Sequence, residues 1–451
     1  MYDPLYHVAP GPQAAPAPSY WHAHTQPLWP STSAILPATA EVVVIGAGYT
    51  GLNAALELAE RYQQEVVVVE ANDLGWGCST RNAGFAMPGT GRLGYSHWQT
   101  KYGEAVAQAI QHEYQAAFAR LERHQQACPE QLQAQLGGYL KIAHHPRTVA
   151  ELYRQYERLV HYEPATSWLN QADIQTRVRS PNAYAAIHYP QSFGLNPLLL
   201  LASIARQAAA ANVQLVTHAT VTDWQTMPGG AYPHHLQTSR GGIQAAKVII
   251  ATNGYTPNQL HTSVHGRTLP ILSSVLVTRP LTALEQQSIA LSPRELVMDT
   301  RTLKYYFRLL PDGRLLFGGR GAVRGKDAEH SRYADRLLRA LVATFPTLQD
   351  LLLEPPAYFW SGWVAAAFDN YPRVYQPADG VFTSMGYCGA GVTFAQLAGQ
   401  RVAQLAMGEP LPALPFYQTP LPRFPLPRLR RIAQRLYYGW YGLIDQIPLS
   451  R

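Results

Sequence analysis

The chain has 451 residues, of which 47% are hydrophobic and 14% charged, which is typical of a globular protein with more than one domain and argues against a disordered chain. Its net charge is +7, but the basic residues form no long run except near the C-terminus, so a nucleic-acid partner is not expected. The three cysteines, Cys78, Cys128 and Cys388, include no C-x-x-C pair, which argues against a disulfide framework, and no metal site is expected.

Residues 1–38 are rich in proline and alanine, which predicts an extended, poorly ordered N-terminal arm. This arm lacks a basic segment followed by an apolar one, so it does not have the pattern of a secretory signal. No run of about 18 apolar residues predicts a membrane-spanning helix. A cytoplasmic location is therefore expected.

Residues 41–72 have the pattern of a strand–helix–strand unit, with two β-branched runs that predict parallel strands buried on both faces. Between these runs, Gly46, Gly48 and Gly51 have the spacing of a turn that lets a pyrophosphate approach a helix N-terminus. Glu70 ends the second strand, where a carboxylate accepts hydrogen bonds from an adenosine ribose. The unit predicts a dinucleotide site, but it does not distinguish a nicotinamide from a flavin.

Helices predicted at 104–126 and 147–162 interrupt the parallel sheet, which returns with strands at 213–216 and 248–251. Between about 265 and 320 the pattern predicts antiparallel strands, with a hairpin at the Pro-Asp-Gly turn. The predicted fold is α/β: a Rossmann-like nucleotide-binding domain built from discontinuous segments, with an inserted antiparallel-sheet domain. The assigned segments are an arm (1–38), the nucleotide-binding domain (39–95, 195–260 and 350–410), the substrate-binding domain (96–194 and 261–349) and a basic C-terminal segment (411–451).

Two further glycine-rich stretches favour a flavin. "LGWGCSTRNAGFA" follows Glu70 and carries Ser79, Arg81 and Asn82, whose donors could reach a second phosphate or the flavin ring. "GYCGAGVTFAQLAG" places glycines before a helix predicted to start near Val392. The N-terminus of such a helix would stabilise the negative charge that a flavin acquires on reduction.

Together with "IIATNGYTP" and "YYFRLLPDGRLLFGG", these motifs resemble the FAD-dependent D-amino-acid-oxidase-like superfamily, in particular the branch that contains gamma-glutamylputrescine oxidoreductase. The resemblance implies FAD as the cofactor and a small amine or amino acid as the substrate. It also implies hydride transfer from the carbon beside nitrogen to flavin N5, followed by hydrolysis of the imine. Molecular oxygen is the implied electron acceptor, and its reduction releases hydrogen peroxide. Two alternatives stay open. One is a dehydrogenase that passes electrons to a quinone or a carrier protein, and the other is a flavin-binding protein without catalysis.

The resemblance also assigns residues to the cofactor, while no catalytic residue is assigned. The chain departs from the family pattern at Cys388 and Ala390, where the branch commonly has serine and histidine. Cys78 and Cys388 raise the question of a covalent flavin, although a packed thiol is the favoured interpretation. The expected cofactor-binding residues are Gly46, Gly48, Tyr49, Thr50, Gly51, Glu70, Ser79, Arg81, Asn82, Gly84, Val221, Gly254, Gly389, Gly391, Val392 and Thr393.

The substrate is expected against the antiparallel sheet. Along the strand predicted at 303–310, alternation places Tyr305 and Phe307 on one face and Lys304, Tyr306 and Arg308 on the other. One of these sets lines either the cavity or the core. The "FWSGW" segment offers an aromatic wall for a cationic amine, or plain core packing. The substrate-binding candidates are Tyr305, Phe307, Arg308 and Trp363.

The C-terminal segment predicts an amphipathic helix. Its apolar positions are Leu429, Ile432, Ala433 and Leu436, with Arg431 and Arg435 on the opposite face. We expect the apolar face to cover the body of the protein or a partner subunit. Contact with an anionic membrane surface is the less favoured interpretation.

Overall fold

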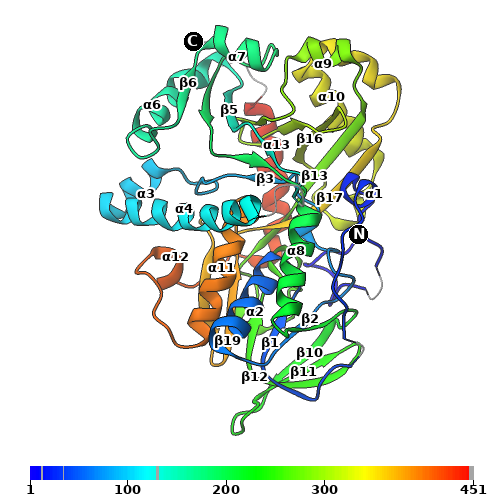
Figure 1. Ribbon diagram of the computed structural model, residues 1–451, viewed down its shortest axis with the longest axis vertical. Helices are drawn as coiled ribbons and strands as arrows, with labels where there is room; N and C mark the ends of the chain where they lie inside the picture. The colour runs from blue at the N-terminus through cyan, green and yellow to red at the C-terminus, as the bar shows by residue number, and fades with distance from the viewer. Residues whose placement is uncertain (12–13, 34, 128–131, 446–451) are drawn as a thin grey trace.

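The computed structural model describes residues 1–11, 14–33, 35–127 and 132–445, and Figure 1 shows two large sheets, one toward the bottom and one toward the top. Cys128 lies outside the described residues. The lower sheet has the order β10-β11-β12-β1-β2-β9, with β19 pairing β12 and β18. Its strands are β1 (Thr39–Ile45), β2 (Val66–Val69), β9 (Gln214–Val216), β10 (Val221–Thr226), β11 (His234–Thr238), β12 (Gly241–Ile250), β18 (Arg373–Ala378) and β19 (Val381–Met385).

The strands at the centre of the lower sheet are parallel, and their side chains are largely buried. β1 pairs in parallel with β2 and with β12, and every residue of β2 is buried. β-branched side chains suit such strands because both faces are covered. The helices that pack with this sheet are α2 (Tyr49–Tyr62), α4 (Glu104–Ala127), α8 (Pro197–Ala210) and α11 (Gly391–Ala406). The strand–helix–strand unit is therefore confirmed, and the side chain of Asn196 caps α8.

The upper sheet has the order β17-β13-β16-β15-β14-β5-β7-β6, and its pairs are antiparallel except for β14 with β5. Its strands are β5 (Tyr139–Ala143), β6 (Ser167–Leu169), β7 (Ala185–Tyr189), β13 (Leu269–Pro280), β14 (Leu296–Asp299), β15 (Tyr306–Leu309), β16 (Arg314–Arg320) and β17 (Tyr358–Ala366). The predicted Pro-Asp-Gly hairpin joins β15 to β16. Because β17 pairs with β13, residues 358–366 lie in the upper sheet, and we propose that the domain boundary follows β17 rather than preceding it.

The remaining elements are short or cover the edges. The helices are α1 (Tyr20–His24), α3 (Tyr95–Tyr102), α6 (Val149–Leu159), α7 (Gln171–Arg177), α9 (Ala283–Ile289), α10 (Ser331–Thr344), α12 (Pro415–Gln418) and α13 (Arg430–Ile444). The short strands β3 (Phe85–Ala86), β4 (Gln135–Leu136) and β8 (Phe193–Gly194) form a third sheet. Across the described ranges, no helix has the length and apolarity needed to cross a bilayer.

The N-terminal arm is tied to the body, contrary to the expectation of a poorly ordered lead-in. Asp3 and Trp21 are almost fully buried. The indole of Trp363 donates to the carbonyl of Tyr2 at 2.7 Å, and that of Trp76 donates to the carbonyl of Ala15 at 3.1 Å. Composition did not predict this because the arm's partners lie far away along the chain.

Helix α13 forms where the C-terminal pattern predicts it, but its orientation is the reverse of the one expected for a helix that covers its own body. Arg431 and Gln434 are buried, while Ile432 and Leu436 are exposed. The reason is a set of polar partners on the body, of which Asp3 pairs with Arg431 at 2.7 Å. The face with Arg431 and Gln434 therefore packs inward and the apolar face outward, while Arg435 stays exposed.

Candidate functional site

One large cavity opens beside the carboxyl ends of β1 and β2, and it encloses about 1320 Å³ when its open mouth is counted. Its walls come from the turn between β1 and α2, from the loop after β2, from the segment after β12 and from the loop before α11. Ligands of open α/β sheets bind at this end of the strands. The fold thus brings segments that are more than 300 residues apart to one site.

The turn at the start of α2 is built to bring the backbone close to a ligand. Gly46 has a φ of +104°, which an L side chain rarely adopts. A Cβ on Gly51 would lie 1.9 Å from the carbonyl oxygen of Gly46, so only glycine lets α2 begin this close to β1. Gly51 therefore shapes the cavity without lining it.

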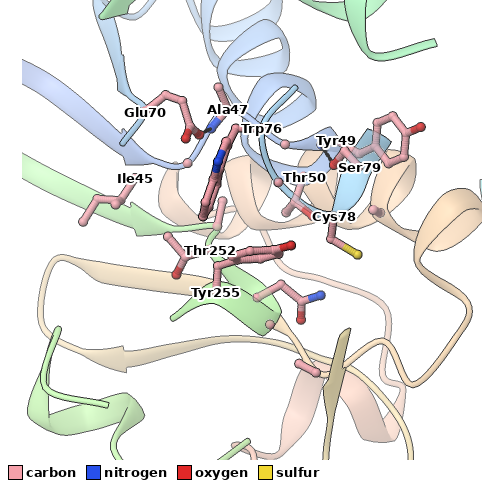
Figure 2. A pocket seen from close by; sticks show the side chains of 18 of the residues that line it. Ile45, Ala47, Tyr49, Thr50, Glu70, Trp76, Cys78, Ser79, Thr252 and Tyr255 are labelled. Atoms are coloured by element: carbon pink, nitrogen blue, oxygen red, sulfur yellow. Dashed lines mark hydrogen bonds between the residues drawn. The ribbon is translucent and has the colours of Figure 1, made fainter. Parts of the chain in front are cut away.

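Glu70 holds the other side of this turn. Its carboxylate accepts hydrogen bonds from the backbone N–H of Ala47 at 2.9 Å and of Asn72 at 3.2 Å, as Figure 2 shows for Ala47. Burial raises the pKa of Glu70, and these backbone donors oppose that rise. The carboxylate both braces the turn and lines the cavity, the position in which it can accept from a ribose.

The loop after β2 contributes Ser79 and Asn82 to the cavity wall. The hydroxyl of Ser79 accepts from the backbone N–H of Tyr49 at 3.0 Å, which joins this loop to the first turn of α2. Arg81 points elsewhere: it donates to the carbonyls of Trp76 at 2.8 Å and Ser361 at 3.1 Å. Its role in this structure is to join the loop to β17.

The loop before α11 forms a third wall of the cavity. The hydroxyls of Thr50 and Tyr387 lie 2.6 Å apart, so the first and last glycine-rich motifs are hydrogen-bonded to each other. Thr393 accepts from the backbone N–H of Met87 at 3.2 Å and does not line the cavity. The turn between β1 and α2 and the loop before α11 are thus held together at the cavity.

The structure places most of the expected cofactor residues on the cavity wall. The four that lie behind it are Gly51, Arg81, Gly84 and Thr393; Gly84 accepts from the backbone N–H of Leu195 at 2.9 Å. Those on the wall are Gly46, Gly48, Tyr49, Thr50, Glu70, Ser79, Asn82, Val221, Gly254, Gly389, Gly391 and Val392.

Two aromatic walls were missed at the level of sequence. The rings of Trp76 and Tyr255 lie 5.3 Å apart at 64° and both face the cavity, with Trp76 between Glu70 and Cys78 in Figure 2. The sequence does contain a signal for them, because each aromatic residue follows a glycine within a motif that the sequence analysis uses: Trp76 in "LGWGCSTRNAGFA" and Tyr255 in "IIATNGYTP". Such rings suit the flat faces of a dinucleotide.

Both cavity cysteines have protonated thiols at neutral pH. Burial raises the pKa of Cys78 and of Cys388 to about 11. The sulfur of Cys388 accepts from the backbone N–H of Ala367 at 3.3 Å. Because a thiol is a weak nucleophile compared with its thiolate, these positions favour a cofactor held without a covalent bond.

The expected substrate residues are not brought to the cavity. Phe307 stacks on Phe317 at 5.6 Å in the core of the upper sheet, and Tyr305 packs against the same core. Trp363 is fully buried against the N-terminal arm. Arg308 donates to the carbonyl of Leu195 at 2.8 Å. Each has a packing partner that accounts for its position, and none lines the cavity.

The opposite face of that strand meets the lower domain. Tyr306 lies edge-on to Phe85 at 5.8 Å, beside the flavin loop. Lys304, on the same face, is half-buried, and burial lowers its pKa, as do the nearby charges of Arg92 and Arg320. The same two arginines act on the thiol of Cys388 at the cavity wall.

Lys304, Arg92 and Arg320 thus form a cationic cluster whose charges act on one another and, for the two arginines, on Cys388, although none of the three lines the cavity itself. Among the described residues, neither Lys304 nor Arg320 has an ion pair or a side-chain hydrogen bond, although the charge of Asp299 acts on Lys304. The nearby Asp299 is already paired with Arg301. Cations that lack an internal partner at a cavity edge are suited to an anionic group of a ligand.

The site as a whole fits FAD. The glycine turn offers a helix N-terminus to the phosphates, Glu70 lies at the end suited to the ribose, and Cys78 lies toward the other end in Figure 2. The open volume and the two aromatic walls suit a ligand with two ring systems. We propose that the residues on the cavity wall hold the cofactor.

Comparisons with known proteins agree with this geometry. The family model described as FAD dependent oxidoreductase matches residues 41–405. A probable oxidoreductase, OrdL, of Rhizobium meliloti is 30% identical over 96% of this chain and 99% of its own. Gamma-glutamylputrescine oxidoreductase of Escherichia coli is 28% identical over 95% and 98%. The solved structure of glycine oxidase from Geobacillus kaustophilus has a TM-score of 0.69 at 20% identity, covering 85% of this chain and 99% of that one.

Proposed function

The chain belongs to the family of FAD-dependent oxidoreductases, and on that premise we propose that it oxidises a small amine that carries a carboxylate group. The observation that supports the substrate class is the cationic cluster of Lys304, Arg92 and Arg320 beside the cavity. The name of the relative gamma-glutamylputrescine oxidoreductase supports an amine whose carboxylate is remote from the reacting nitrogen.

The cluster has two consequences for a bound amine. It pairs with the carboxylate and so fixes the distance between that group and the reacting carbon. Its positive potential also disfavours an ammonium ion nearby, which lowers the pKa of the substrate nitrogen and favours the neutral amine. Only the neutral amine has the free electron pair that allows loss of hydride from the adjacent carbon.

The residues of the chain position the substrate and exclude water. Bound FAD would supply the acceptor for a hydride, which amounts to two electrons and one proton. Trp76 and Tyr255 wall the cavity with apolar surface. The substrate loses a hydride from the carbon beside nitrogen and becomes an iminium ion. Addition of water to that carbon and departure of the nitrogen then give a carbonyl compound and a second amine or ammonia.

We further propose that molecular oxygen takes up the electrons, so that each turnover releases hydrogen peroxide. The fold similarity to a glycine oxidase supports this choice. A dehydrogenase that uses a quinone or a carrier protein would perform the same oxidation with another acceptor.

A panel of matched amines tests the substrate class. We expect a gamma-glutamylated diamine to give peroxide under air, and its carboxamide counterpart to have a kcat/KM lower by about 10- to 100-fold, because the amide lacks one charged hydrogen-bonding partner. Equal activity with acids and amides would contradict the carboxylate assignment. Turnover only with an added quinone analogue would replace the oxidase with a dehydrogenase.

A further inference from the structure

Helix α13 is held with its polar face against the body. The guanidinium of Arg431 pairs with buried Asp3 at 2.7 Å and lies 4.8 Å above the ring of Trp363. Arg430 donates to the side chain of Asn258 at 3.0 Å. These partners come from three distant parts of the chain, so they determine which face of the helix points to solvent.

The outward face is a narrow apolar stripe. With successive residues 100° apart, its members fall within an arc of about 80° on the side opposite Arg431. A surface helix normally buries such a stripe. The stripe consists of Leu429 (47% exposed), Ile432 (55%), Leu436 (70%), Trp440 (64%) and Leu443 (58%).

An exposed apolar side chain also precedes the helix. Leu426 is 70% exposed. Apolar side chains in contact with solvent are therefore not confined to α13.

The charges on the segment that carries the stripe have one sign. Arg423, Arg428 and Arg435 are exposed, and between residues 419 and 444 the sequence has no acidic residue. Arg435 falls on one edge of the stripe in a helical projection, and Arg428 lies in the turn just before the helix. A second copy of the chain packed on the stripe would bring these arginines toward their counterparts without an acidic partner, whereas a layer of anionic headgroups would neutralise them.

We propose that the outward face of α13 docks on an anionic lipid bilayer, with the helix lying in the plane of the interface. The leucines and Ile432 would enter the boundary between headgroups and acyl chains, and Trp440 has the amphipathic ring favoured at that depth. These arginines would contact lipid phosphates. The binding is peripheral and reversible, because one helix supplies it.

Co-sedimentation of the full-length holoenzyme with vesicles tests the proposal. We expect at least tenfold stronger partitioning to vesicles of phosphatidylcholine with phosphatidylglycerol than to phosphatidylcholine alone, and a loss of binding at high salt. The partitioning of the double variant Leu436→Gln/Trp440→Gln to the anionic vesicles should be at least tenfold weaker than that of the parent. The matched control Leu284→Gln/Leu353→Gln changes side chains that are 78% and 86% exposed elsewhere and should bind like the parent.

Flavin absorbance of each purified variant reports that the fold and the cofactor site are intact, so the outcome is independent of which amine is oxidised. Absence of binding to the anionic vesicles would overturn the proposal, as would equal binding by the stripe variant and its control. A stable dimer in solution that the stripe variant alone dissociates would assign the surface to a second copy instead.

Discussion

Replacing Gly51 by alanine is expected to yield protein that purifies almost without flavin. The new Cβ would lie 1.9 Å from the carbonyl oxygen of Gly46, which cannot move without distorting the turn between β1 and α2. Relief requires α2 to shift away from the sheet, and its N-terminus would then no longer meet the phosphates. Loss of two charge-assisted hydrogen bonds corresponds to an FAD Kd at least about 100-fold higher.

The overpacked turn should also lower the free energy of unfolding by about 1–3 kcal/mol, measured by denaturant titration without added FAD. Gly439→Ala is the matched control, since a Cβ there meets nothing within 4 Å and alanine favours a helix. Flavin fluorescence quenching gives the Kd of both variants. Parent-like FAD affinity in Gly51→Ala would show that the cofactor does not depend on this turn.

Replacing Arg320 by methionine should raise KM for a carboxylate-bearing amine by roughly 10- to 100-fold, with a smaller change in kcat. Methionine keeps an unbranched apolar stem but lacks the charge that acts on Lys304 and on Cys388. Because the carboxylate is bound in the ground state as well as during reaction, the effect appears mainly in KM. Steady-state kinetics with acid and carboxamide substrates measure it.

The amide substrate is the internal control, since its kcat/KM should be nearly the same in the parent and in Arg320→Met. Arg320→Lys should recover part of the activity toward the acid, and Arg339→Met removes an exposed charge from α10 without effect. An equal loss for acid and amide would mean that Arg320 supports the structure and does not recognise the carboxylate. The cationic cluster would then carry no information about the substrate.

The cofactor half of the site is predictable because its signals are local. The turn with Gly46 and Gly51, the strands around it and Glu70 lie within about 30 residues, the span of one strand–helix–strand unit. The convergence of the loops near Ser79 and Gly389 follows from the parallel sheet, whose strand ends meet at one edge. These features need no knowledge of distant packing.

The substrate half is not predictable in the same way, because it depends on which face of a strand meets the other domain. Alternation places Phe307 and Tyr306 on opposite faces of the strand, but it does not show which of the two faces packs in the core. Phe317 and Phe345, which pack on Phe307, decide the matter from the following elements. The face with Lys304 is therefore recognised only in the folded chain.

Helix α13 shows the same limit on a larger scale. Its period predicts the helix, and the usual rule predicts that the apolar stripe is buried. The ion pair between Arg431 and Asp3, which are 428 residues apart, reverses the packing. No local pattern contains that information.

Anaerobic absorbance spectroscopy tests the central claim most directly. Purified protein should carry a flavin spectrum, and mixing with a gamma-glutamylated diamine in the absence of oxygen should bleach its visible flavin band. Readmitting air should restore the band and release about one peroxide for each flavin. Protein that binds no FAD, or a flavin that no carboxylate-bearing amine bleaches, would contradict the account.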